Sequence, residues 1–201
     1  MIIGPANLSN KIQGLLLLMM LAWGADHCQR GASSSWGGKM NGTIQDVGDG
    51  FKAAMRRVAS TVNVISICTD GAPMGITATA MSSLSMDPPS LLICINRSAS
   101  MHRSMEEVSH FCVNVLHRDQ EDIARMFADR RQHALRFASG WEVDCARPPR
   151  LLDAQAALLC RRTEHHRFAT HSIFIGVVED VQVREDVRPL VYVNGNYGAV
   201  G

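Results

Sequence analysis

The chain has 201 residues, of which 46% are hydrophobic, and its 20 basic residues nearly balance 19 acidic ones. This length and composition predict one domain with a sizeable core and exclude a large multidomain enzyme. A formal net charge of +1 gives the protein no strong overall electrostatic attraction to nucleic acid or to an anionic membrane, so we expect neither as a partner.

The first forty residues carry no catalytic pattern. Lys11, the apolar run 14–22 and the small residues Gly24 and Ala25 have the outline of a secretory signal that is too short to span a bilayer. The other interpretation is an upstream extension before a later start at Met40, since 31–38 is rich in Gly and Ser. We assign 1–42 to an N-terminal extension or linker and 43–201 to the working domain.

The domain is expected to open with a helix and a hairpin. Asp49 is a suitable cap for a helix that places Phe51, Met55 and Val58 on one core-facing side. The β-branched stretch 61–68 and a second extended stretch, 74–81, flank the turn residues of 70–73, and this pattern predicts a hairpin.

The rest of the chain alternates short strands with two helices. The break Asp87-Pro88-Pro89 precedes a buried strand at 91–95. Helical spacing is present at 100–109 and at 119–129. The remaining strand candidates are 111–116, 154–162, 172–183 and 190–193.

Strands dominate and most connections are short, which favours an antiparallel sheet closed into a barrel with a few covering helices. A Rossmann fold would require G-x-G-x-x-G directly after the first strand, and the sequence has none there. The protein is therefore expected to be mainly β and to bind any nicotinamide in another way.

The cysteines and histidines give no metal pattern. The cysteines are far apart without a C-x-x-C pair, and Cys68, Cys94, Cys112 and Cys160 lie in apolar runs, which suits reduced thiols in the cytoplasm. His165 and His166 are adjacent on a predicted extended segment, so their side chains point to opposite faces. We expect no metal site.

Four segments of the chain together match the sequence signature of a known protein family, and they follow one another in the same order as in that family. The segment 75–89 (GITATAMSSLSMDPP) resembles the signature of the flavin reductase-like family, and the likeness continues through 91–100, 111–116 and 189–197. The resemblance implies a split β-barrel with Greek-key topology that forms a homodimer. It also implies FMN or FAD reduced by NADH or NADPH, in a family that includes reductase partners of two-component monooxygenases and cobalt corrinoid reductases.

Small side chains in the signature let backbone groups approach a flat heterocycle, although the same composition is common in polar turns. The resemblance places a first set of residues at the flavin ring and ribityl chain: Pro73, Gly75, Ile76, Thr77, Thr79 and Ala80. It places a second set at the next strand end: Cys94, Ile95 and Asn96.

Two further pairs complete the predicted flavin site. Ser100 and Met101 open a predicted helix, whose free N–H groups favour a flavin phosphate. Met126 and Phe127 match another flavin-contacting pair of the family, and the spacing of these two residues fits core packing equally well.

The nicotinamide site is predicted from two places in the chain. His171 matches a family histidine near the nicotinamide, although Ala169-Thr170 replaces the usual Gly-Asp before it and a surface histidine in a turn is the other interpretation. The resemblance also implicates Tyr192, Val193, Asn194 and Gly195. Asn194 stands where the family often has arginine, which argues against a strong preference for the extra phosphate of NADPH.

These residues predict an NAD(P)H:flavin oxidoreductase that works by positioning two ring systems for hydride transfer, with His171 as the catalytic residue. Reduced flavin would then pass to a monooxygenase partner. Two alternatives stay open at this stage: a flavoprotein that reduces a cobalt corrinoid from Co(II) to Co(I), and a flavin-binding module without turnover.

Overall fold

The computed structural model describes residues 44–144 and 146–200. The predicted extension, 1–42, and both interpretations of it lie outside the described residues. The chain divides into two units, Met1–Val47 and Gly48–Gly201, and the second holds the fold. No helix in the described ranges is long and apolar enough to cross a bilayer.

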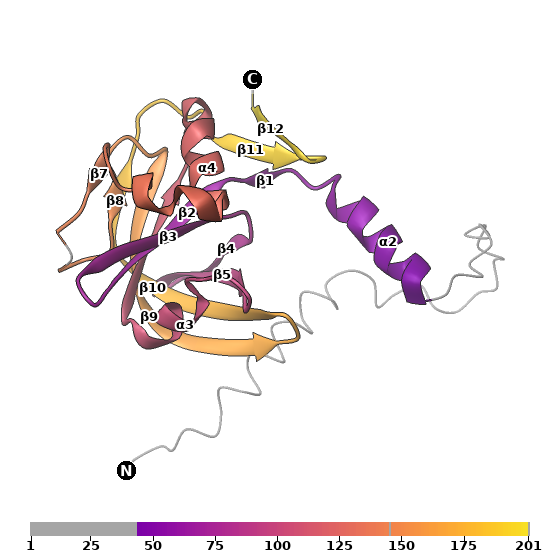
Figure 1. Ribbon diagram of the computed structural model, residues 1–201, viewed down its shortest axis with the longest axis horizontal. Coiled ribbons are helices and arrows are strands. Elements are labelled where there is room, and N and C mark those ends of the chain that lie inside the picture. The colour runs from indigo at the N-terminus through magenta and orange to yellow at the C-terminus, as the bar shows by residue number, and fades with distance from the viewer. Residues whose placement is uncertain (1–43, 145, 201) are drawn as a thin grey trace, which may run out of the picture. The chain divides into compact units, whose positions relative to one another are not determined.

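A seven-stranded antiparallel sheet forms the body of the protein (Figure 1), in the spatial order β3-β2-β6-β9-β10-β5-β4. Its strands are β2 (Asn63–Thr69), β3 (Ala72–Ala78), β4 (Met81–Met86), β5 (Pro89–Asn96), β6 (His110–Val115), β9 (Ala156–Phe168) and β10 (His171–Val183).

The connection between β3 and β4 shows how the sheet closes. These strands are the two edges of the sheet, yet only Thr79 and Ala80 separate them in the chain. The three Cα–Cα steps from Ala78 to Met81 span at most about 11 Å, so the sheet must roll until its edges approach each other there. The edges are not paired along their length, and the predicted split barrel is confirmed.

The predicted hairpin is also confirmed. A two-residue turn at Asp70 and Gly71 joins β2 to β3, and their φ angles of 51° and 74° are those of the turn that suits twisted strands. Pro73, in β3, lies opposite Cys68 of β2. Because β3 is an edge strand, the missing N–H of proline is tolerated there.

Two small sheets flank the barrel. The first joins β1 (Ser60–Thr61), β11 (Leu190–Val193) and β12 (Asn196–Ala199), with a tight turn at Asn194 and Gly195. The second pairs β7 (Trp141–Glu142) with β8 (Arg150–Leu151).

The helices are short. They are α2 (Ile44–Met55), α3 (His102–Glu107) and α4 (Glu121–Ala128), with 3-10 turns η1 (Arg118–Gln120) and η2 (Arg130–Leu135) on either side of α4. Helices α3 and α4 lie beside the sheet (Figure 1). One core fills the barrel around Ile65, Phe111 and Phe174. A second core lies beneath α4, where the rings of Phe127, Phe137 and Trp141 meet at centroid distances of 5.0 to 5.1 Å.

The predicted core-packing helix capped by Asp49 is wrong in two respects. Helix α2 begins at Ile44, so Asp49 lies inside it. Phe51, Met55 and Val58 are 63%, 49% and 51% exposed, so that face is not packed into a core in the described part of the chain. Apolar spacing predicts which side of a helix is buried, but not which surface buries it.

The remaining differences lie in strands with polar sequences. Strand β4 was not predicted because serines at 82, 83 and 85 have low strand propensity, yet pairing with β5 holds it. Strand β12 was also missed. Strand β9 continues beyond the predicted end at Arg162 to Phe168, since β10 pairs with it along its whole length.

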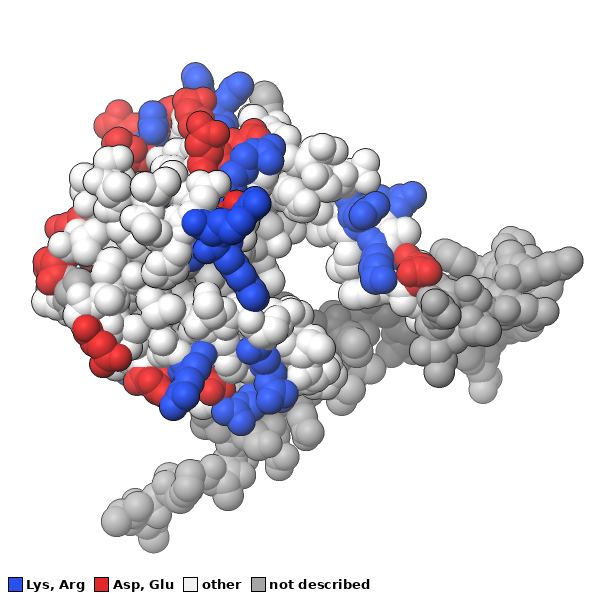
Figure 2. Space-filling view, in the orientation of Figure 1, with Lys and Arg blue, Asp and Glu red and all other residues white. Residues whose placement is uncertain are grey.

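The surface carries both signs of charge. On the face shown in Figure 2, acidic side chains lie mainly toward the rim, basic side chains lie both near the rim and in a group near the middle, and much of the area is uncharged. This mixed pattern is consistent with the near-zero net charge.

Candidate functional site

The first part of the predicted flavin segment is closed by the protein itself. A Cβ on Gly75 would lie 2.7 Å from Cε1 of Phe127, and the Gly75 carbonyl accepts a 2.8 Å hydrogen bond from Nη1 of Arg136. Arg136 is buried and also donates to the carbonyls of Met126 and Asp129. The glycine therefore makes room for an aromatic side chain of the second core.

The residues near Gly75 are also engaged in contacts within the protein. The Thr77 hydroxyl donates to the carbonyl of Ala124 in α4 at 2.6 Å. Ile76 points to the opposite face and packs against the barrel core. Pro73 alternates with Gly75 and Thr77, so it shares the α4 side of β3. Together, 73–77 forms a packed wall.

Three more predicted flavin residues have side chains in the core. Ile95, Met101 and Phe127 are at most 1% exposed. Met126 is half-buried and packs against the second core. These side chains support the walls of the barrel, so any contact with a ligand from Ile95 or Met101 would come from the backbone.

The second part of the segment is open. Thr79 and Ala80 are exposed, and the Ala80 carbonyl accepts a 3.0 Å hydrogen bond from the Cys94 amide of β5. Cys94 is half-buried, and burial raises the pKa of its thiol, which keeps it neutral. Small, uncharged groups thus border the opening between β3 and β4.

His171 lies at the same end of the barrel. It is exposed and sits directly opposite Asn96 in the β10–β5 register, so both side chains share one face. Its Nδ1 lies 2.9 Å from the Thr170 hydroxyl. Asn96 accepts hydrogen bonds from the amide and hydroxyl of Ser98, and Ser100 follows on the surface just before α3.

The C-terminal stretch reaches the opening from the other side. Tyr192, Val193, Asn194 and Gly195 line a groove together with Thr79 and Ala80. The basic residues Lys52, Arg56 and Arg57 line it as well, and the Asn194 amide donates to the Arg56 carbonyl at 2.7 Å. His171 is not among the groove residues and lies farther along, beyond Cys94 and Asn96.

An unpaired acceptor lies beside this opening. Asn63 is buried, and its Nδ2 donates to the carbonyls of Thr61 and Ala78 at 3.0 and 3.3 Å. Within the described residues its Oδ1 has no partner. Ala78 immediately precedes Thr79, so a ligand N–H entering at Thr79 is the kind of group that this oxygen lacks.

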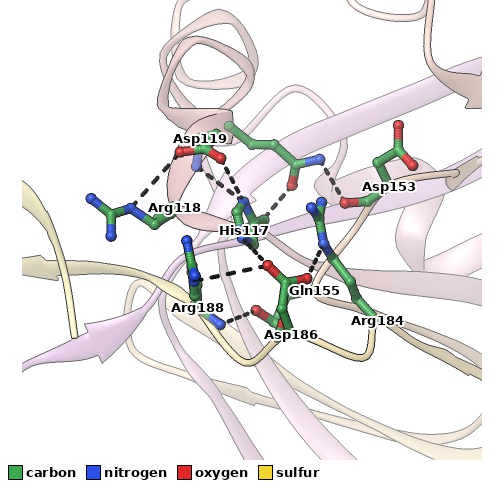
Figure 3. A network of polar contacts seen from close by, with 9 residues as sticks. His117, Arg118, Asp119, Asp153, Gln155, Arg184, Asp186 and Arg188 are labelled. Atoms are coloured by element: carbon green, nitrogen blue, oxygen red, sulfur yellow. Dashed lines mark hydrogen bonds and ion pairs between the residues drawn. The ribbon is translucent and has the colours of Figure 1, made fainter. Parts of the chain in front are cut away.

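A buried histidine holds the start of β11 (Figure 3). The ring of His117 is 2% exposed; its Nδ1 lies 3.3 Å from Asp119 and its Nε2 lies 3.3 Å from Asp186. Gln155 donates to the Asp186 carbonyl at 2.9 Å and accepts from the Arg188 amide at 2.6 Å. The hydrogen bond from Arg184 lowers the pKa of the Asp186 carboxyl, and the nearby His117 ring lowers it as well.

This polar network was missed from the sequence. Its members lie in stretches that resemble solvated turns, and only the fold brings 117–119 next to 184–188. The network contacts the segment 186–189, which leads into β11 and Tyr192.

The adjacent histidines of β9 behave as expected from strand geometry. His165 Nε2 lies 3.8 Å from Glu106, whereas His166 Nε2 lies 3.1 Å from Glu164. Their rings therefore approach different carboxylates. The described ranges contain no group of three or more His, Cys, Asp or Glu side chains suited to a metal.

Comparisons with known proteins agree with this architecture. Residues 55–201 match the model of the flavin reductase like domain. The chain is 39% identical over 158 residues to the reductase component of an FADH(2)-dependent resorcinol hydroxylase from Rhizobium sp., covering 77% of this chain and 88% of that protein. It is 36% identical to the FMN reductase (NADH) RutF of Pseudomonas syringae, covering 73% and 83%.

A solved structure is similar over the same region. The crystal structure of a putative flavin reductase from Haemophilus somnus superposes with a TM-score of 0.71 at 30% identity, covering 76% of this chain and 98% of that one. The family expected from the sequence signature is thereby confirmed. The protein belongs to the flavin reductase-like domain family.

Proposed function

We propose that the protein is an NAD(P)H:flavin oxidoreductase that reduces FMN or FAD and supplies the reduced flavin to an oxygenase. The observation that carries this proposal is the meeting of Thr79 and Ala80 with Tyr192–Gly195 in one groove. One relative is a reductase component of a resorcinol hydroxylase, and another is an NADH-dependent FMN reductase. These names support both the donor and the destination of the electrons.

The flavin is proposed to bind at the open end of the barrel. Thr79 and Ala80 are small and exposed, so their backbone can approach a flat ring. Cys94 lines the same end, and Asn96 and Ser100 offer polar groups beyond it. The packed residues 73–77, with Ile95, Met101, Met126 and Phe127, contribute by holding the shape of that end.

The hydride donor is proposed to lie against the flavin between His171 and the groove. When Nδ1 of His171 is engaged by Thr170, Nε2 remains available to a nicotinamide carboxamide. A flavin bound there would accept the hydride, and the protein would hold the two rings against each other for that transfer. Because Asn194 stands where the family often has an arginine, we propose NADH as the donor.

The decisive experiment measures NADH oxidation by the purified protein with and without added FMN or FAD. Turnover that requires free flavin supports the proposal. A yellow protein that binds flavin but never oxidises NADH or NADPH would leave a binding module. Formation of Co(I) from a Co(II) corrinoid, faster than reduction of free flavin, would favour the corrinoid reductase instead.

We further propose a homodimer in the cytoplasm. The exposed apolar face of α2, with Phe51, Met55 and Val58, is the type of surface that a second copy covers. Light scattering should give twice the chain mass of 22.0 kDa. An active monomer would contradict the dimer.

The cytoplasmic location is supported by the buried cysteines. Burial raises the pKa of Cys112 and of Cys160 to about 12, so these thiols are unreactive and suit a reducing compartment.

A further inference from the structure

The hairpin of β9 and β10 extends beyond its neighbour on one side of the sheet. Strand β6 pairs with β9 only as far as Arg161, and no strand of the described ranges pairs with 163–168 on that side. On the other side, β5 pairs with β10 as far as His171, at the tip of the hairpin. The tip that carries His171 therefore lacks a strand neighbour along β9.

Helix α3 contacts the last residue pair before the tip. Arg167 of β9 and Ser172 of β10 lie directly opposite each other in the register. The Arg167 guanidinium donates to both carboxylate oxygens of Glu106 at 2.9 and 3.0 Å. His102 Nε2 lies 2.8 Å from the Ser172 hydroxyl, and both of these side chains are buried. One helix thus contacts both strands of the hairpin just before the turn.

Glu106 lies among basic side chains. In addition to Arg167, the Nε2 atoms of His102 and His165 lie 3.9 and 3.8 Å from its carboxylate. The hydrogen bond from Arg167 lowers the pKa of Glu106, so this carboxyl stays ionised. Its side chain is 18% exposed, whereas that of Glu107 on the same helix is 62% exposed. A shielded contact through two oxygens restrains the hairpin more than an exposed ion pair would.

These contacts lie on the face of the hairpin opposite His171. Side chains alternate along a strand, so Ser172 points toward α3 while His171 points to the other face. Ser172 is accordingly fully buried and His171 is exposed. Helix α3 therefore lies behind His171 and can set its position without contacting a ligand in front of it.

We infer that Glu106 is a positioning residue, which holds the hairpin tip through Arg167 and so fixes the place of His171 relative to the flavin. This inference rests on the proposed function. Helix α3 follows directly on the end of the proposed flavin site, so the same helix connects that site to the hairpin. Hydride transfer depends steeply on the placement of the two rings, so a looser tip slows it.

The test measures anaerobic bleaching of bound flavin at saturating NADH. Glu106→Gln keeps the shape of the side chain and removes its charge, so bleaching should slow about 5-fold at an unchanged flavin dissociation constant. Glu107→Gln, an exposed change on the same helix, is the matched control and should bleach at the wild-type rate. Arg167→Met removes the other half of the contact at a side chain that is 58% exposed. It should reproduce the slowing, and it carries the same test if Glu106→Gln does not fold.

A double variant separates positioning from a merely structural role. If Glu106 acts through His171, Glu106→Gln should cause no further slowing in a His171→Ala background. A structural role would slow bleaching by the same factor in both backgrounds. That result, or a wild-type rate in Glu106→Gln, would overturn the inference.

Hydrogen exchange tests the same contact without turnover. The amides of 163–172 should exchange about 10-fold faster in Glu106→Gln than in Glu107→Gln, because the contact that holds this end of the hairpin is weakened. Unchanged exchange in an active flavin reductase would overturn the inference and leave the proposed function intact. If the wild-type protein never reduces flavin with NADH, the proposed function is wrong, and the role of Glu106 in that reaction is wrong with it.

Discussion

The two parts of the segment 73–80 differ in what touches them. Gly75 and Thr77 face α4, where Phe127, Arg136 and the Ala124 carbonyl contact them directly. Thr79 and Ala80, only a few residues later, are exposed beside a groove. The difference arises because β3 ends at Ala78 and the chain crosses the split of the barrel before β4.

The small residues of this one signature therefore have two different roles. At Gly75 the absence of a side chain allows close packing inside the protein. At Thr79 and Ala80 a small side chain leaves an opening for a ligand. The same division applies to two histidines, since His117 is enclosed by carboxylates and His171 is exposed at a hairpin tip.

The largest effect is expected at the packed part. Gly75→Ala should lower the free energy of unfolding by about 2–3 kcal/mol, because the new methyl group overlaps Phe127 and the carbonyl of Ile65. Urea denaturation measures this loss. Gly50→Ala is the matched control, since a Cβ there meets no atom within 4 Å and alanine favours the helix. Equal stability of the two variants would contradict the packing role of Gly75.

His117→Ala is expected to cost about 2 kcal/mol of stability, since it removes the buried ring that lies between Asp119 and Asp186. Thermal unfolding measures the change. The rate of flavin reduction per folded molecule should stay within about two-fold of wild type, because His117 does not line the groove. A large loss of rate without a loss of stability would place His117 in the reaction instead.

Thr79→Leu should weaken flavin binding about 10-fold or more, because a branched chain then occupies the opening that the ring must approach. Fluorescence quenching gives the dissociation constant. The stability of this variant should match the wild type, since Thr79 is exposed. Thr79→Ser should bind flavin normally. If Thr79→Leu also binds flavin normally, the open end of the barrel is not the flavin site.

His171→Ala should slow anaerobic bleaching of bound flavin by NADH about 10-fold, which corresponds to one lost hydrogen bond of roughly 1.5 kcal/mol. Flavin affinity and stability should remain near wild type, in contrast to Thr79→Leu and His117→Ala. If flavin is reduced at the wild-type rate, His171 is only a turn residue.

The smallest effect is expected from removing residues 1–40. Their composition is that of a linker, so flavin binding and NADH oxidation should be unchanged. Size-exclusion chromatography and a steady-state assay test this. Loss of folded, flavin-binding protein would show that the working domain begins earlier than 43.

Much of the secondary structure followed from local sequence. Runs of β-branched residues predicted β2, β5, β6 and β10, because such side chains favour a pleated, half-buried surface. The serines of β4 carry no such preference, so that strand depends on pairing with β5. The face of α2 was predicted correctly as apolar, but it is exposed in the described part of the chain, contrary to the predicted burial.

The sequence alone determined the family and the mainly β architecture, because signature order and local propensity are properties of the chain itself. Only the tertiary structure decided which of the predicted site residues are open. Thr79, Ala80, Asn96 and His171 are exposed at one end of the barrel, whereas Gly75, Met101 and Phe127 are enclosed. That distinction depends on how the sheet rolls and where α4 packs, and both involve contacts between residues far apart in the chain.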